Sequence, residues 1–145
     1  MPAAQDHANH TRWFAPYHFV LALLLLAGFI GAIVNLYQSI GDHQRLYSAS
    51  LILLLTVALF MTAFCARFFA LRAQDRVIRL EENLRHHMMT GRLLDPRITV
   101  PQVIGLRFAS DAEFVALAKR AADEGLSQAD IKKAIKTWRP DEYRV

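Results

Sequence analysis

Histidines near both ends of the chain are the side chains whose type and spacing come closest to metal chemistry. His7 and His10 lie three residues apart, His18 follows them, and His86 and His87 are adjacent. If the N-terminal residues fold under the C-terminal part, His10, His18 and His87 converge, and imidazole nitrogens are good Zn²⁺ ligands. However, the chain has no HExxH motif, and neither a cysteine nor a carboxylate stands at a ligand spacing from these histidines. We therefore expect hydrogen bonds to the backbone or to lipid head groups, and neither a metal nor another cofactor.

Motifs for nucleophilic or phosphate chemistry are also missing. The sequence has no GxSxG, no P-loop and no GxGxxG, and Ser48 and Ser50 belong to an apolar segment. The single cysteine, Cys65, lies in an apolar run and has no partner within the chain for a disulfide. At 145 residues there is no room for a large catalytic domain beside the apolar segments. We expect a protein that is not an enzyme.

Two long apolar segments dominate the first half of the chain. Residues 19–36 contain one polar side chain, Asn35, and no charge, and residues 51–66 form a second run. A helix of about 20 apolar residues crosses about 30 Å of hydrocarbon, and a lone segment in lipid must be helical to satisfy its backbone. The sequence predicts an all-α membrane protein with transmembrane helices at 17–39 and 47–70, joined by a turn at 40–46. A cleaved secretory signal is disfavoured, because the first run is too long and a second follows closely.

Lysine and arginine bias sets the expected orientation. The turn carries only Arg45, whereas several arginines follow the second span, so the leader at 1–16 and the C-terminal part are predicted to be cytoplasmic. Aromatic side chains flank both spans as candidate interface anchors; they are Trp13, Tyr17, Tyr37 and Tyr47. Four arginines that spiral around the end of the second span are expected either to contact anionic lipid head groups or only to set topology; they are Arg67, Arg72, Arg76 and Arg79.

Small residues predict where helices pack in lipid, because they let two backbones approach closely. The residues of this predicted helix-packing interface are Ala27, Gly31, Asn35, Ala66, Ala70 and Ala73. From Ala66, Ala70 and Ala73 onward, apolar residues recur at alternating steps of four and three, which is the pattern of a coiled-coil-like seam. The further seam residues are Val77, Leu80, Leu84 and His87. No glycine or proline interrupts residues 51–90, so the helix is expected to continue as a cytoplasmic extension over 71–91. The alternative is that this face packs on the chain's own C-terminal domain.

The remaining residues, 92–145, predict a small cytoplasmic helical tail domain. Helix starts are indicated by Thr99 with Gln102, by Ser110 with Glu113, and by a third Ser-x-x-Asp pair at 127–130. The last helix is expected to continue until Pro140 stops it. The last two helices resemble a helix-turn-helix with lysines on the second helix. However, residues 72–145 hold 14 basic and 11 acidic side chains, which is a poor electrostatic footprint for nucleic acid.

Several short motifs are similar to those of an uncharacterised family of short bacterial two-span membrane proteins, a domain of unknown function. The motifs are Asn9-His10-x-Arg12, Pro16-x-His18-Phe19, Gln74-Asp75-Arg76, Leu106-Arg107-Phe108-Ala109 and Ile131-Lys132-Lys133-Ala134-Ile135-Lys136-x-Trp138. The resemblance covers nearly the whole chain and implies a multi-pass protein of a bacterial inner membrane. It implies no activity and no catalytic or binding residues.

These features favour a non-catalytic accessory or scaffolding subunit of a larger membrane protein complex. Its spans would pack along the partner, and its tail would clamp the partner's cytoplasmic face. The alternative is a membrane protein that self-associates through the coiled-coil-like seam. A membrane-tethered nucleic-acid-binding module is a further possibility, which the nearly balanced charge of the tail disfavours.

Overall fold

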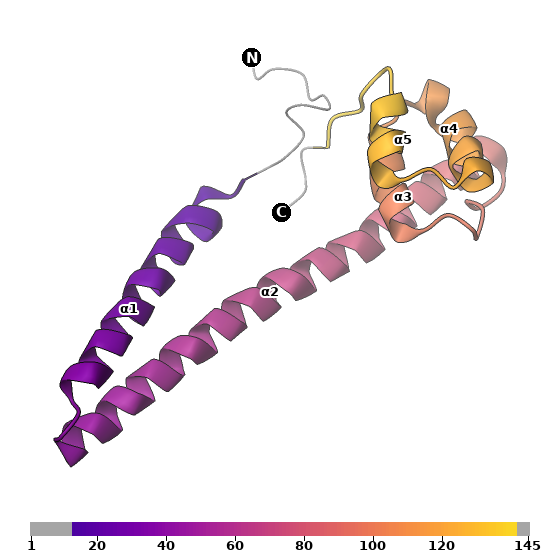
Figure 1. The fold of residues 1–145 in the computed structure, drawn as a ribbon. Helices are drawn as coiled ribbons and strands as arrows, with labels where there is room; N and C mark the ends of the chain where they lie inside the picture. Colours follow the sequence, from indigo (N-terminus) through magenta and orange to yellow (C-terminus); the bar gives the residue numbers. More distant parts are fainter. Residues whose placement is uncertain (1–12, 142–145) are drawn as a thin grey trace. The chain divides into compact units, whose positions relative to one another are not determined.

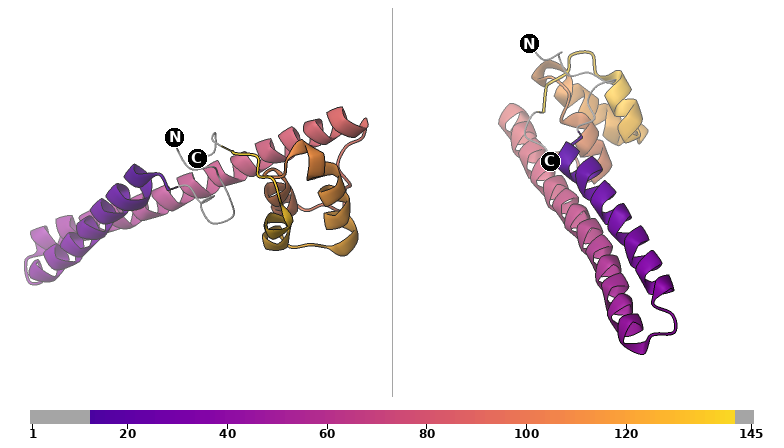
Figure 2. Two further views of the ribbon diagram at one scale, coloured as in Figure 1. Left: turned by 90° about the horizontal axis from the view of Figure 1, so that it is seen from above. Right: turned by 90° about the vertical axis from the view of Figure 1, so that its left-hand side faces the viewer.

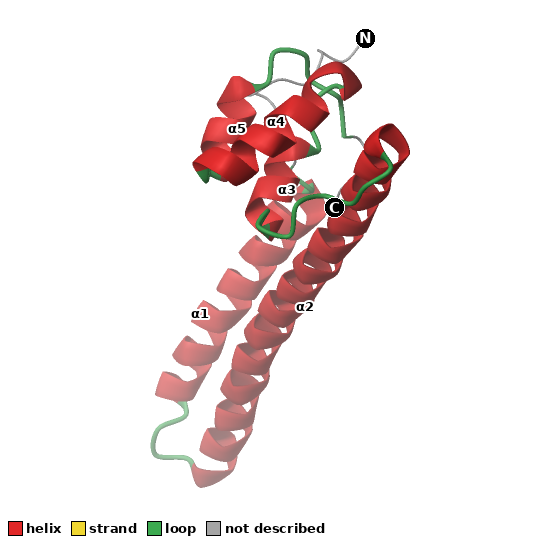
Figure 3. Ribbon diagram, turned by 90° about the vertical axis from the view of Figure 1, so that its right-hand side faces the viewer, coloured by secondary structure: helices red, strands yellow, loops and turns green. Residues whose placement is uncertain are grey.

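The computed structural model describes residues 13–141, which divide into two compact units (Figure 1). The hairpin unit is Trp13–Ala70, and the tail unit is the described chain from residue 71 onward. The helices are a π-helix at Pro16–Leu21, then α1 (Ala22–Gln38), α2 (His43–Thr90), α3 (Val100–Leu106), α4 (Asp111–Glu124) and α5 (Gln128–Ala134). The described residues contain no β-strand (Figure 3), so the predicted all-helical class is confirmed for this part of the chain.

In the hairpin unit, α1 and the apolar half of α2 run antiparallel, side by side (Figures 1 and 2). The chain reverses at Gly41, whose φ of 101° favours a residue without a side chain. The Asp42 carboxylate then accepts hydrogen bonds from the backbone N–H groups of Gln44 and Arg45, at 3.1 and 3.2 Å. This cap starts α2 at His43, so the helix begins within the segment predicted as turn.

The hairpin unit buries one small side chain on each of its two helices. Ala32 on α1 and Ala49 on α2 are buried, and the rings of Phe29 and Phe60 meet edge to face at 5.8 Å. Most other apolar side chains of this unit face outward; Leu23, for example, is 68% exposed. Both helices are long and apolar enough to cross a membrane.

Helix α2 is continuous over 48 residues, as the absence of glycine and proline predicts. Its apolar half belongs to the hairpin unit and its charged half to the tail unit. Gly91, with a φ of 74°, ends the helix in the left-handed conformation expected of a C-terminal glycine.

The tail unit has its own hydrophobic core, to which α2 contributes Ile78. Its fully buried side chains include Val103, Leu106, Phe108, Phe114 and Ile131. Helices α3 and α5 pack closely at Gly105, where an added Cβ would lie 3.1 Å from Ile131 Cγ2. The predicted capping box of Thr99 and Gln102 is present. The 127–130 start is confirmed too, because Ser127 Oγ accepts a hydrogen bond from the Asp130 N–H.

The last helix is shorter than predicted. It was expected to continue to Pro140, but α5 ends at Ala134, and Ile135 has an extended backbone. The reason is tertiary: Trp138 packs on Phe108, with ring centroids 5.0 Å apart, and an isolated antiparallel bridge pairs Trp138 with Ala109. A helical continuation would not place Trp138 on Phe108.

Candidate functional site: a charged groove beside an exposed apolar seam

A groove of about 860 Å³ lies in the tail unit, between the charged half of α2 and three other places: the end of α3, the start of α4 and the segment after α5. Its α2 side includes Ile78, Glu82 and Arg85, and its other side includes Asp111 and Arg139. The remaining lining residues are Gln74, Val77, Glu81, Arg107, Pro140 and Asp141. This charged groove is where the tail unit concentrates its ionisable side chains.

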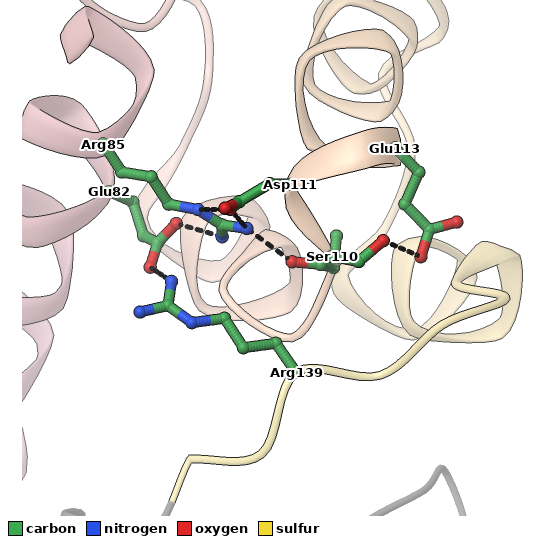
Figure 4. Close-up of polar contacts among 7 residues, drawn as sticks. Glu82, Arg85, Ser110, Asp111, Glu113 and Arg139 are labelled. Atoms are coloured by element: carbon green, nitrogen blue, oxygen red, sulfur yellow. Dashed lines mark hydrogen bonds and ion pairs between the residues drawn. The ribbon is translucent and has the colours of Figure 1, made fainter. Parts of the chain in front are cut away.

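Glu82 is the most buried charge in the groove, at 5% exposure. Figure 4 shows its carboxylate between two guanidinium groups: Arg85 Nη1 lies 3.0 Å from Oε2, and Arg139 Nη1 lies 3.8 Å from Oε1. Burial raises the pKa of the Glu82 carboxyl, and the hydrogen bond and charge of Arg85 oppose that shift. The carboxylate therefore depends on both arginines to remain ionised in an apolar setting.

Arg85 joins α2 to the start of α4. It donates from Nε to Asp111 Oδ1 at 2.8 Å and from Nη2 to the carbonyl oxygen of Ala109 at 2.8 Å. Its guanidinium carbon lies 4.2 Å from the centroid of the Phe114 ring. The hydrogen bond and the positive charge of Arg85 lower the pKa of Asp111, which sits in the first turn of α4. One side chain thus links the long helix to an ion pair, a backbone carbonyl and the tail core.

Glu113 positions the C-terminal side of the groove. Its carboxylate accepts hydrogen bonds from the backbone N–H groups of Lys136 and Thr137, at 3.2 and 3.0 Å. Burial alone would raise the pKa of Glu113, but these hydrogen bonds outweigh it and the pKa is lowered. The Arg139 N–H donates to the carbonyl oxygen of Phe108 at 2.7 Å. These contacts hold the segment that carries the Arg139 side chain to Glu82.

The lining of the groove consists mainly of charged side chains that are paired with one another. Its described lining has three arginines and four carboxylates and holds no serine, cysteine, histidine or lysine. Each arginine is already paired with a carboxylate; Arg107, for example, lies 3.3 Å from Asp141. Such a groove is nearly neutral overall, so it does not attract a phosphate group as an unpaired arginine cluster would.

The coiled-coil-like seam lies beside this groove and is open. Val77, Leu80 and Leu84 are 51%, 71% and 59% exposed, and His87 is exposed as well. The tail unit packs instead on the neighbouring face of α2, which carries Ile78 and the groove charges. The alternative that the chain's own tail domain covers the seam is therefore wrong, because α2 contributes Ile78, one position after Val77, to the tail core.

The predicted helix-packing residues also face outward. Ala27, Gly31 and Asn35 are exposed, and a Cβ added to Gly31 would meet nothing within 4 Å. The second-span group, Ala66, Ala70 and Ala73, is exposed too. The buried residue of α1 is Ala32 instead. Packing of the outward stripe against a further helix remains a prediction.

The candidate interface anchors differ among themselves. Trp13, Tyr37 and Tyr47 are 63%, 75% and 65% exposed. Tyr17 instead donates from Oη to the carbonyl oxygen of Ala63 at 2.7 Å, so it joins the two helices of the hairpin. The guanidinium of Arg67 lies 5.8 Å from the Tyr17 ring. The remaining three arginines of the predicted spiral are exposed, and their contact with lipid head groups stays a prediction; they are Arg72, Arg76 and Arg79.

The histidine hypothesis is only partly covered by the described residues. His7 and His10 lie outside them, as does most of the predicted leader at 1–16. Within residues 13–141, no group of three His, Cys, Asp or Glu side chains is arranged to hold a metal ion. His86 Nδ1 lies 2.7 Å from the carbonyl oxygen of Arg92, next to the end of α2.

Sequence reasoning missed the groove. The spacing of Glu82 and Arg85 was visible as a helical i,i+3 pair, but nothing in the sequence indicated its partners. Asp111 and Glu113 lie in the first turn of α4, whereas Arg139 follows α5, and only the packing of the tail unit brings both segments to α2. The i,i+3 spacing of Glu82 and Arg85 is the one sequence signal that belongs to the groove.

Fold and site together define the class of this chain: a helical protein with two helices of membrane-spanning length and composition, one of which carries a small helical unit. A family model described as a family of unknown function (DUF6526) matches residues 1–145, so the chain belongs to this family. Neither a curated protein nor a solved structure matches it.

Proposed function

We propose that this chain is a non-catalytic accessory subunit, anchored in a bacterial inner membrane by its hairpin, whose tail unit binds the cytoplasmic face of a larger membrane protein complex. The observation that carries the proposal is the division of α2. Its apolar half leaves large side chains such as Phe64, 71% exposed, without a covering partner in the hairpin unit. Its charged half is built into the core of the tail unit through Ile78. A protein bound by the tail is thereby tied to a membrane helix.

Two features support binding to a protein. The outward stripe of Ala27, Gly31 and Asn35 offers a close approach to a further transmembrane helix, since an added Cβ at Gly31 meets nothing in this chain. The charged groove offers paired ions on the tail. A subunit that binds through both a transmembrane helix and a tail contacts two separate surfaces of the same assembly.

The first test is the partner itself. The full-length chain, tagged and expressed at its native level, is extracted in mild detergent, separated on a native gel and analysed by mass spectrometry. We expect co-migration with one larger membrane assembly. Gly31→Leu should release the chain from it, because the new side chain separates the helices. The matched control, Ile30→Phe, enlarges an exposed side chain about 100° away around α1 and should leave co-migration intact. Migration without any other protein contradicts the proposal.

Orientation is tested separately in a Cys65→Ser background. We expect an impermeant thiol reagent to label Gln44→Cys from outside the cell and to leave Lys119→Cys unlabelled until the membrane is opened. Both positions are exposed in the structure, so access depends on the membrane alone. Labelling of both positions, or of Lys119→Cys alone, contradicts cytoplasmic termini.

A further inference from the structure

We infer that the charged half of α2 pairs with the same segment of a second copy of this chain, as a parallel two-stranded coiled coil. The open seam supplies the apolar layers. In heptad notation Ala70, Val77 and Leu84 occupy a positions, and Ala73 and Leu80 occupy d positions. The central layers, Val77 at a and Leu80 at d, have the combination of a β-branched residue and a leucine that favours two parallel strands. The central layers, Val77, Leu80 and Leu84, are more than half exposed in the single chain.

Charge complementarity identifies the second copy as the occupant. In the same register Arg76 falls on a g position and Glu81 on the e position of the next heptad. Across a parallel dimer, these positions face each other, so Arg76 of each copy meets Glu81 of the other, and twofold symmetry makes the pair twice. Both side chains are exposed, and neither forms an ion pair with another described residue. Within one helix a spacing of five residues does not bring them together.

The tail unit leaves room for this pairing. Ile78, Glu82 and Arg85, which face the tail, lie roughly a third of a turn or more around α2 from the seam, at about 100° per residue. A second helix on the seam therefore meets neither the tail core nor the Glu82 ion pairs. Val77 and Glu81 stand at the border, since both also line the charged groove.

The parallel orientation rests on the proposed membrane anchoring, because two copies inserted in the same sense have parallel α2 helices. The membrane end of the seam is compatible with close approach, since Ala66, Ala70 and Ala73 are small and exposed. The dimer goes beyond the accessory role: it gives each assembly two tails and predicts a twofold arrangement of whatever they bind.

The pairing is tested on the full-length Cys65→Ser chain in phospholipid vesicles. Leu84→Cys should form a symmetric disulfide-linked dimer on mild oxidation, since a positions meet across the axis. Arg79→Cys, at an exposed c position, should stay monomeric under the same oxidation. Equal cross-linking of the two variants, or none at Leu84→Cys, overturns the inference.

A charge swap tests the register. Energy transfer between labelled copies, measured as the chain is diluted with lipid, should show association about tenfold or more weaker for Arg76→Glu and for Glu81→Arg, because like charges then face each other. The combined Arg76→Glu, Glu81→Arg variant should regain most of the association. The matched control Arg79→Glu makes the same change of charge off the seam and should stay within about twofold of the parent. Absence of rescue by the swap overturns the register.

Failure of the dimer and failure of the accessory role are distinguishable. Recovery of the larger assembly with a single copy of this chain overturns the dimer and leaves the accessory role standing. Recovery of a cross-linked dimer with no other protein supports the dimer and overturns the accessory role.

Discussion

The hairpin unit and the tail unit are both rich in apolar side chains, yet they place them in opposite ways. In the tail, Leu106, Phe108 and Phe114 are fully buried. In the hairpin, Leu24 and Phe64 are 64% and 71% exposed, and the buried contacts are small alanines. Exposing that much apolar surface to water costs a large free energy, whereas exposing it to hydrocarbon costs none. One chain therefore combines a unit with a buried core and a unit whose helices have the length and composition of membrane spans, and α2 belongs to both.

The largest test of this contrast is a pair of phenylalanine truncations. Phe114→Ala should lower the free energy of unfolding of the tail unit by about 3–5 kcal/mol, because it empties a fully buried site. Phe64→Ala should change hairpin stability in a bilayer by less than about 1 kcal/mol, since its side chain meets no core. Denaturant unfolding with hydrogen-exchange readout of each unit measures both. Similar effects would mean that the hairpin has a core of its own.

Arginine pairing is the next difference. Arg85→Ala should destabilise the tail by about 3 kcal/mol, because it leaves the buried Glu82 carboxylate with only the distant Arg139 and removes the link to Asp111. The control Arg79→Ala removes an exposed arginine of the same helix and should stay within about 0.5 kcal/mol. Unfolding of the tail amides, followed by hydrogen exchange, reports the difference. An equal loss of stability in both variants would mean that the ion pairs of Arg85 contribute no more than any arginine on this helix.

Alanine substitution of one glycine in each unit tests the same contrast with a smaller expected change in stability. Gly105→Ala should destabilise the tail by about 1 kcal/mol, since crowding against Ile131 and the carbonyl oxygen of Gln128 outweighs the gain in helix propensity. Gly31→Ala should leave the isolated hairpin unchanged or slightly more stable, because its Cβ meets nothing. Thermal unfolding of each variant in detergent gives both values. Destabilisation by Gly31→Ala would mean that another part of the same chain packs against Gly31.

The smallest expected effect is a difference in pH dependence. Asp111 and Glu113 have lowered pKa values in the folded tail, so their stabilising contribution is complete above their ordinary values of 3.8 and 4.5 and is lost as the pH falls below them. Asp95, whose pKa the neighbouring Arg97 lowers to about 2, acts in the same direction. Glu82 acts in the opposite direction: because its pKa is raised in the folded tail, its contribution to the free energy of unfolding increases as the pH falls. The net result should be acid destabilisation of the tail.

Glu113→Gln sharpens this prediction. The variant should lose about 1–2 kcal/mol at pH 7, since the two backbone N–H groups bind different carboxylate oxygens and the amide keeps only one acceptor oxygen. It should lose less than the parent on further acidification. Circular dichroism of thermal unfolding between pH 7 and pH 3 measures both terms. An acid loss as steep as that of the parent would assign the effect to the other carboxylates.

The sequence by itself determined the elements whose cause is local. An uninterrupted run of helix-forming residues makes α2 continuous, and a glycine ends it. The capping pairs at Thr99 and Ser127 start helices because side-chain oxygens accept the first free N–H groups. Apolar length and composition define two helices that can cross a membrane, without any reference to tertiary contacts.

Only the tertiary structure decided which face of each helix is covered. A shift of one residue, from Val77 to Ile78, turns a side chain by about 100° and exchanges the open seam for the tail core. The end of α5 at Ala134 was likewise settled by the packing of Trp138 on Phe108, which lies 30 positions earlier in the chain. The charged groove has the same origin, because its carboxylates and arginines come from segments that local sequence rules do not connect. Low dielectric strengthens the pairing of Glu82 with Arg85 only once folding has buried both side chains.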